Sequence, residues 1–299
     1  MKKSVSLLLA GLMLCGALAG CGGNNNTAEN TDSQTEQTSE STGTSGAIHV
    51  VSREDGSGTR GAFVELTGVE DDNGDNTTVD AEIANRTDAV LTTVAGNEAA
   101  IGYVSLGSLN DTVKAVKVDG VEATVDNVKS GTYTLSRPFN IATKGEPTGV
   151  AKDFINFILS ADGQAIVEEE NYIKVDDAAP AFTSDGSSGQ IAVGGSSSVS
   201  PVMEKLIEAY KAVNPNAQID LQTSDSTSGM TGAMDGTFAI GMASRELKDE
   251  EAAQLTGTAI ALDGIAVIVN TANTVENLTM DQIRSIYVGE TTDWSEVAE

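Results

Sequence analysis

A repeated order of elements along the chain constrains the fold more than any other feature. A short apolar run leads into a loop rich in Gly, Ser and Thr, and a stretch with helical spacing follows. Strands that alternate with helices in this way are typical of α/β proteins. Four such loops occupy residues 56–59, 194–198, 224–229 and 243–245. We therefore expect an α/β fold in which several strands end in similar loops.

The runs beside these loops predict individual elements. Strands are expected at 47–52 and 138–145, a helix from Thr59, and a helix, a turn and a strand within 87–106. Helical spacing continues over 149–171, and residues 176–190 are small and polar, which is typical of a linker. After the linker, the strand, loop and helix order recurs in 191–215, 218–236 and 238–252, and the apolar run 258–270 predicts a pair of strands or one crossover.

The first 46 residues differ in composition from the rest. Residues 1–20 begin with two lysines, continue with a short apolar run and end in "LAGC" with Cys21 last. The run is short for a membrane span, so we interpret it as a lipoprotein signal peptide rather than a buried or membrane helix. Residues 21–46 are almost entirely polar and predict a disordered tether. Cleavage before Cys21 would leave a lipid anchor on an exported protein with no disulfide, since the other cysteine, Cys15, lies in the signal.

The formal charge of −27 excludes several partners. A strongly acidic surface repels nucleic acid and anionic lipid headgroups, so nucleic acid is not an expected partner. An anion would have to be held by local geometry.

The four loops offer such a geometry. Glycine lets the backbone approach a ligand, hydroxyls donate hydrogen bonds, and a helix N-terminus presents free N–H groups at its positive end. Each loop alone could equally be an ordinary helix cap. Four of them with Arg53 alongside favour a site for a tetrahedral oxyanion, in which Asp55 either holds the Arg53 guanidinium for structure or orients it toward a ligand.

Signals for catalysis are weak. The sequence contains neither a G-x-x-x-x-G-K-[ST] nucleotide loop nor a G-x-S-x-G nucleophile elbow. Its single histidine, His49, lies in an apolar strand and fits a packed residue better than a base. No metal or other cofactor is expected, because the sequence has no histidine cluster and no cysteine after Cys21 for a soft metal. The acidic stretch 70–80 lacks the closing Glu of a calcium loop and fits a surface turn.

Several segments together resemble a known family. "GGSSSVSPVMEKL", "IGMASRELKDEE", "TDWSEV", "VVSREDGSGTRGAF" and "SRPFNIATKGEP" are similar to segments of the phosphate-binding lipoproteins of bacterial phosphate ABC importers. The resemblance implies a periplasmic-binding-protein-like fold of type II, with two α/β lobes that close on phosphate around a hinge. One lobe would hold about 190–260 with 140–178, and the other about 262–299 with 47–137.

The order of these segments differs from that of the family. The family's C-terminal half matches 47–178, its N-terminal half matches 190–299, and 179–189 would join them. The final "DWSEVAE" and the first folded residues "AIHVVSR" match the two sides of one family junction. We interpret this as a circular permutation that leaves 47–299 as one two-lobed domain, the alternative being a fragment of a tandem protein.

The resemblance also implies site residues. Phosphate-facing positions would be Arg53, Ser57, Gly58 and Thr59 on one lobe, and Ser197, Ser198, Ser226, Thr227 and Ser244 on the other. Some relatives carry an aspartate where Ser244 stands, as acceptor for the proton of hydrogen phosphate. Asp225 and Asp263 are candidate substitutes, whereas Asp55 is assigned to Arg53.

The function implied is that of an extracytoplasmic, lipid-anchored receptor. It would capture inorganic phosphate as a monomer, perform no chemistry, and present the anion to a membrane permease of an ABC importer. A phosphate-ester hydrolase and a sensor or adhesin domain with a degenerate site remain as alternatives.

Overall fold

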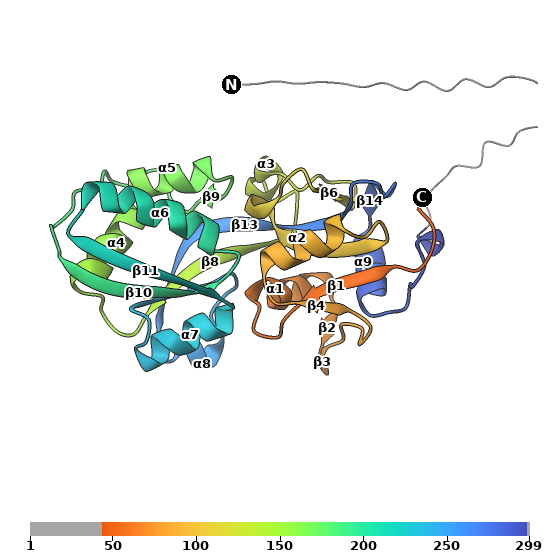
Figure 1. Cartoon of the computed structure of the whole chain (residues 1–299), viewed down its shortest axis with the longest axis horizontal. Coiled ribbons are helices and arrows are strands. Elements are labelled where there is room, and N and C mark those ends of the chain that lie inside the picture. The colour runs from red at the N-terminus through yellow and green to blue at the C-terminus, as the bar shows by residue number, and fades with distance from the viewer. Residues whose placement is uncertain (1–43, 298–299) are drawn as a thin grey trace, which may run out of the picture. The chain divides into compact units, whose positions relative to one another are not determined.

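The computed structural model describes residues 44–297. The predicted signal peptide, Cys21 and nearly all of the predicted tether lie outside the described residues. The strands are β1 His49–Arg53, β2 Glu70–Asp71, β3 Gly74–Asp75, β4 Glu82–Ala84, β5 Ala100–Ser105, β6 Val113–Ala115, β7 Lys117–Val118, β8 Ser136–Thr143, β9 Ile173–Lys174, β10 Gly189–Ser196, β11 Ala217–Ser224, β12 Ile240–Ala243, β13 Thr256–Asn270 and β14 Asn277–Leu278 (Figure 1). The helices are α1 Gly58–Thr67, α2 Thr87–Ala95, α3 Val125–Lys129, α4 Gly149–Ile158, α5 Ala161–Glu169, α6 Ser200–Val213, α7 Ser226–Asp235, α8 Asp249–Ala252 and α9 Met280–Tyr287, with short 3₁₀ turns at Leu106–Ser108 and Trp294–Glu296.

Most strands belong to one mixed sheet with the order β11-β10-β12-β8-β13-β5-β1-β4. At one end β10, β11 and β12 are parallel, at the other β1, β4 and β5 are parallel, and β8 and β13 run antiparallel to their neighbours between them. Parallel strands need crossover connections, which are mainly helices here. The predicted α/β architecture is therefore confirmed.

β13 joins the two ends of the sheet. Its first part, from Thr256 to Gly264, pairs with β8, and its last part, from Ile265 to Val269, pairs with β5. The sequence left open whether 258–270 forms two strands or one crossover, and the structure contains one uninterrupted strand (Figure 1). The change of partner between Gly264 and Ile265 marks the point where the chain crosses.

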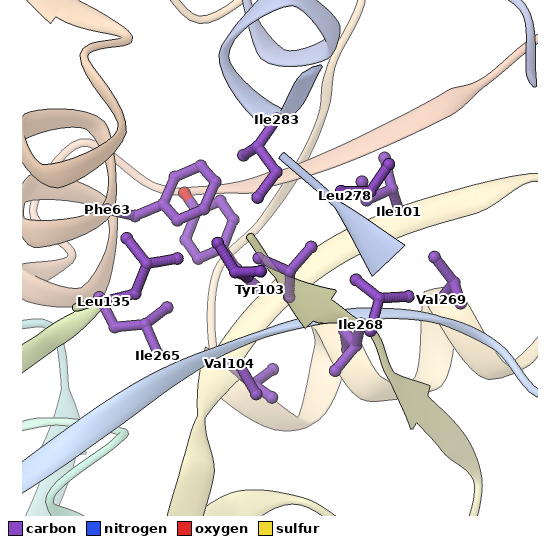
Figure 2. Close-up of a cluster of buried hydrophobic side chains, with 14 of the residues drawn as sticks. Phe63, Ile101, Tyr103, Val104, Leu135, Ile265, Ile268, Val269, Leu278 and Ile283 are labelled. Atoms are coloured by element: carbon purple, nitrogen blue, oxygen red, sulfur yellow. The ribbon is translucent and has the colours of Figure 1, made fainter. Parts of the chain in front are cut away.

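Two main apolar cores lie on either side of this crossing. We call residues 44–135 and 265–297 the first lobe, whose core includes Phe63 stacked on Tyr103 at 3.9 Å between ring centroids, with Ile268 and Ile283 nearby (Figure 2). Residues 138–262 form the second lobe, with its own core around Phe154. The two cores draw largely on the segments that the resemblance implied for each lobe. Ile173 and Leu262, which the second lobe contains, pack in the first core instead.

The helical stretch predicted over 149–171 is divided in two. Ser160 ends α4 and caps α5, since its Oγ donates to the Phe157 carbonyl and accepts from the Gly163 N–H. A Cβ on Gly163 would lie 2.2 Å from the Phe157 carbonyl oxygen, so only glycine fits this tight break. Apolar spacing did not reveal the break because both helices bury one face in the same core.

The two ends of the described chain lie side by side. The Ile48 N–H donates to the Thr292 carbonyl at 2.8 Å, and the Trp294 N–H donates to the Gly46 carbonyl at 3.0 Å. Trp294 Nε1 also donates to the Ala99 carbonyl. The last described residues are therefore hydrogen-bonded to the first ones, within the first lobe.

The linker between the halves is held by one buried carboxylate. Asp153 on α4 is 1% exposed and accepts hydrogen bonds from the Ser184 hydroxyl and the Asp185 N–H of the linker. It also accepts from Tyr210 Oη at 2.8 Å and from Asn214 Nδ2 at 3.3 Å on the α6 side. Burial alone would raise the pKa of Asp153, but these donors outweigh burial and lower the pKa below 3.8.

We predict that Asp153→Ala lowers the free energy of unfolding by roughly 2–4 kcal/mol, because four donors lose a charged acceptor. Because the pKa of Asp153 is lower in the folded protein than in the unfolded chain, the ionised carboxylate adds to the free energy of unfolding at neutral pH. This contribution is lost as the pH falls below 3.8. Urea unfolding at pH 7 and at about pH 3 measures both effects. The exposed Asp72→Ala is the control, and an equal difference between parent and Asp153→Ala at both pH values would contradict the prediction.

Candidate functional site

Polar side chains from both lobes meet at one buried cluster beside the crossing. Helices α1 and α2 of the first lobe and α7 of the second begin there, as does the loop between β10 and α6. Ser57 and Asp225 cap α1 and α7 through bonds to the N–H groups of Arg60 and Ser228. Several positive helix ends therefore lie near one place, as the Gly, Ser and Thr loops predicted.

Hydroxyl groups bridge the lobes directly. Thr59 Oγ1 lies 2.8 Å from Ser198 Oγ, and Thr87 Oγ1 lies 3.3 Å from Ser197 Oγ and 3.2 Å from Ser198 Oγ. The Thr227 N–H donates to the carbonyl of Gly56 at 3.2 Å. Apart from the partly exposed Gly56 and Thr227, these residues are buried.

Ser244 and Ser226 complete the cluster from the second lobe. Ser244 Oγ accepts from Ser196 Oγ at 2.9 Å and lies 3.4 Å from Thr59 Oγ1, and the Ser244 N–H donates to Ser226 Oγ. Gly58 lies against both residues, because a Cβ on it would be 2.4 Å from Ser226 Oγ and 2.9 Å from Ser244 Oγ. Glycine at this position lets the start of α1 approach the second lobe.

Arg53 enters the cluster at the end of β1 and is 2% exposed. Its Nη2 donates to Ser197 Oγ at 3.1 Å, and Nε and Nη2 form a two-point contact with Glu54 at 2.9 and 2.8 Å. The assignment of Asp55 to Arg53 is wrong. Asp55 is 98% exposed and pairs with Arg60, because it follows the strand in a turn that faces solvent.

The candidate proton acceptors have other partners. Asp225 accepts from the N–H and hydroxyl of Ser228, which is the contact of a helix cap. Asp263 is fully buried and lies 2.6 Å from Arg137 Nη1. Burial raises the pKa of Asp263, and the neighbouring guanidinium opposes this only in part. Neither carboxylate has a hydrogen bond to the hydroxyls of the cluster.

The predicted site residues omit three residues of the cluster, of which Ser196 lies within the predicted loop 194–198. Ser196 and Thr87 follow the same pattern as the predicted hydroxyls, since one ends β10 and the other begins α2. Arg137 is a buried arginine on β8 whose Nη2 donates to Thr59 Oγ1 at 3.2 Å. An arginine directly before the apolar run 138–145 was the available signal.

Two pockets are lined in part by residues of the cluster. One of about 430 Å³ is lined by Thr87 and Ser197 with Arg86, and one of about 450 Å³ is lined by Ser57 and Thr227 with Arg245 and other residues.

Residues considered for other chemistry have partners other than the hydroxyls of the cluster. His49 is partly exposed and forms a 2.8 Å contact with Glu82. The acidic stretch forms the β2–β3 turn, where Asp75 pairs with Arg60. Within 44–297, no group of three or more His, Cys, Asp or Glu residues could hold a metal ion, and no helix is long and apolar enough to cross a membrane.

The chain is similar to known proteins over its whole length. A family model described as a PBP superfamily domain matches residues 17–162 and 180–299. The phosphate-binding protein PstS 2 of Streptococcus agalactiae is 48% identical, and its namesake from Streptococcus pneumoniae is 44% identical, each over 99% of both chains. The phosphate-binding protein PstS of Bacillus subtilis is 37% identical over 44% of this chain and 42% of its own.

A solved structure agrees with these matches. The crystal structure of a phosphate-binding protein of a phosphate ABC transporter from Streptococcus pneumoniae has a TM-score of 0.69 and 46% identity, and the match covers 85% of this chain and 100% of that one. This chain therefore belongs to the PBP superfamily and, within it, to the family of the PstS phosphate-binding proteins.

Proposed function

We propose that this protein captures inorganic phosphate between its two lobes and delivers it to the membrane permease of a phosphate ABC importer. The observation that carries the proposal is the cluster of buried hydroxyls from both lobes around Arg53. The full-length relatives named as phosphate-binding proteins support the same ligand.

The cluster suits a tetrahedral oxyanion physically. Each hydroxyl carries one proton and two lone pairs and can rotate, so groups that bond to each other in this structure can donate to an anion instead. The N-termini of α1 and α7 add N–H donors, and Arg53 adds a positive charge. Glu54 holds the guanidinium in place and offsets its charge, so donor geometry rather than net charge would hold the anion.

The proposal extends to the place of the protein in the cell. We propose that the mature chain is a monomer outside the cytoplasm, anchored through a lipid on Cys21 and without catalytic activity. The "LAGC" motif supports the anchor, and His49 has no contact with the cluster that would support a catalytic base.

We further propose that 47–178 and 190–299 are the family's two halves in permuted order, joined by 179–189. The hydrogen bond from the Ile48 N–H to the Thr292 carbonyl supports this proposal, because these two residues come from the segments that match the two sides of the family junction. The streptococcal relatives align over 99% of both chains, whereas the Bacillus subtilis match covers less than half of either.

Separately expressed halves test this domain organisation. Each half contributes strands to both lobes, so we expect neither 47–178 nor 190–299 to fold alone and expect the mixture to recover structure. Circular dichroism and urea unfolding measure this. If each half unfolded cooperatively on its own, the proposal that 47–299 form one domain would be contradicted.

Calorimetric titration tests the ligand. We expect the protein to bind inorganic phosphate and to release no product from a chromogenic phosphate ester. Absence of phosphate binding by protein that unfolds cooperatively would instead favour a sensor or adhesin with a degenerate site, and ester hydrolysis would favour an enzyme.

Replacing Arg53 by Ala should weaken phosphate binding by on the order of 2–5 kcal/mol, because the buried anion loses a charge-assisted contact. This corresponds to roughly 30-fold to several thousand-fold in Kd. Arg284→Ala is the matched control, since Arg284 is partly exposed on α9 and contacts the Gly68 carbonyl. Unchanged affinity in Arg53→Ala would remove this residue from the site.

Gly58→Ala should weaken phosphate binding by about tenfold or more, because its Cβ would meet Ser226 and Ser244 and hold the lobes apart. Gly61→Ala, one turn along the same helix, is the control, since its Cβ would meet only Arg245 Cδ at 3.8 Å. Similar affinities in the two variants would show that this close approach is not needed.

A further inference from the structure

Arg137 contacts the crossing strand and both lobes through a single guanidinium group. It lies on β8, directly opposite Asp263 of β13, at the point where the chain crosses between the lobes. Its side chain is 3% exposed. Nη1 lies 2.6 Å from Asp263 Oδ2 and donates to the Gly264 carbonyl at 2.8 Å, which fixes the guanidinium on the crossing strand.

The other side of the guanidinium reaches both lobes. Nη2 donates to Thr59 Oγ1 at the start of α1 in the first lobe, at 3.2 Å, and Nε donates to the Ser244 carbonyl of the second lobe at 3.3 Å. The planar guanidinium of an arginine can donate hydrogen bonds in all of these directions at once, whereas a lysine ammonium is a single point charge.

The contact with Thr59 sets the direction of a hydrogen bond. A guanidinium has donors only, so the Thr59 oxygen must accept from Arg137. The single proton of Thr59 then points elsewhere, and the hydroxyl is available as a donor on the side of Ser198, 2.8 Å away. Arg53 acts in the same way on Ser197, which accepts from its Nη2.

We propose that Arg137 is a positioning residue for the captured anion. It keeps the Thr59 hydroxyl in the donor orientation and ties Thr59 to the Ser244 backbone, so that donors from the two lobes are aligned on one tetrahedral oxyanion. The inference rests on the proposed function and concerns how affinity arises at the same site.

A double-mutant cycle with inorganic phosphate tests this role in the whole protein. Calorimetry measures Kd for the parent, Arg137→Gln, Thr59→Val and the double variant. We expect Arg137→Gln to weaken binding by about 10- to 100-fold and Thr59→Val to weaken it measurably. If Arg137 acts through Thr59, removing Arg137 in the Thr59→Val background should cost less than about threefold.

Other outcomes separate this role from a structural one. If Arg137 only stabilised the crossing, its removal would cost the same affinity with or without the Thr59 hydroxyl, and additive losses would overturn the proposal. Unchanged affinity in Arg137→Gln would overturn it while leaving the proposed function intact. Should Arg137→Gln not fold, Arg137→Lys keeps the charge without the fork, and parental affinity in that variant would equally overturn the proposal. A folded parent that does not bind phosphate would overturn the proposed function and this inference with it.

Discussion

β13 is the constraint on which the rest of the structure depends. A single strand of 15 residues pairs first with β8 and then with β5, so the lobes share one sheet rather than two independent ones. From Ala261 to Asn270 nearly every residue is buried, which is the pattern of a strand covered on both faces. Loops at the strand ends of the two lobes are thereby brought to face each other beside the crossing.

The arginines are distributed unevenly over the structure. Five of the six arginines, namely Arg53, Arg60, Arg86, Arg137 and Arg245, lie in the cluster or line the two pockets. Each of the five pairs with at least one carboxylate within 3.0 Å. The acidic chain therefore concentrates its arginines at one place and still keeps that place close to neutral, which favours capture by oriented donors over attraction by a general positive field.

Local patterns in the sequence were sufficient to predict the α/β class and most of the residues in the hydroxyl cluster. Glycine, serine and threonine recur between an apolar strand and a helix in four loops, and Thr59, Ser198, Ser226 and Ser244 from these loops lie close together. Asp55 was misassigned because the choice between neighbouring acids depends on which one the turn exposes. Arg137 was missed because its importance comes from contacts with Thr59, Ser244 and Asp263, which are remote in sequence.

The contact between the first and last described residues also determines what tryptophan fluorescence reports in this protein. Trp294 is the only tryptophan of the chain. It is buried in the first lobe beside the contact between Gly46 and Asp293, with its indole N–H on the Ala99 carbonyl. Tryptophan emission from this protein therefore reports on the contact between residues 46–48 and 292–294.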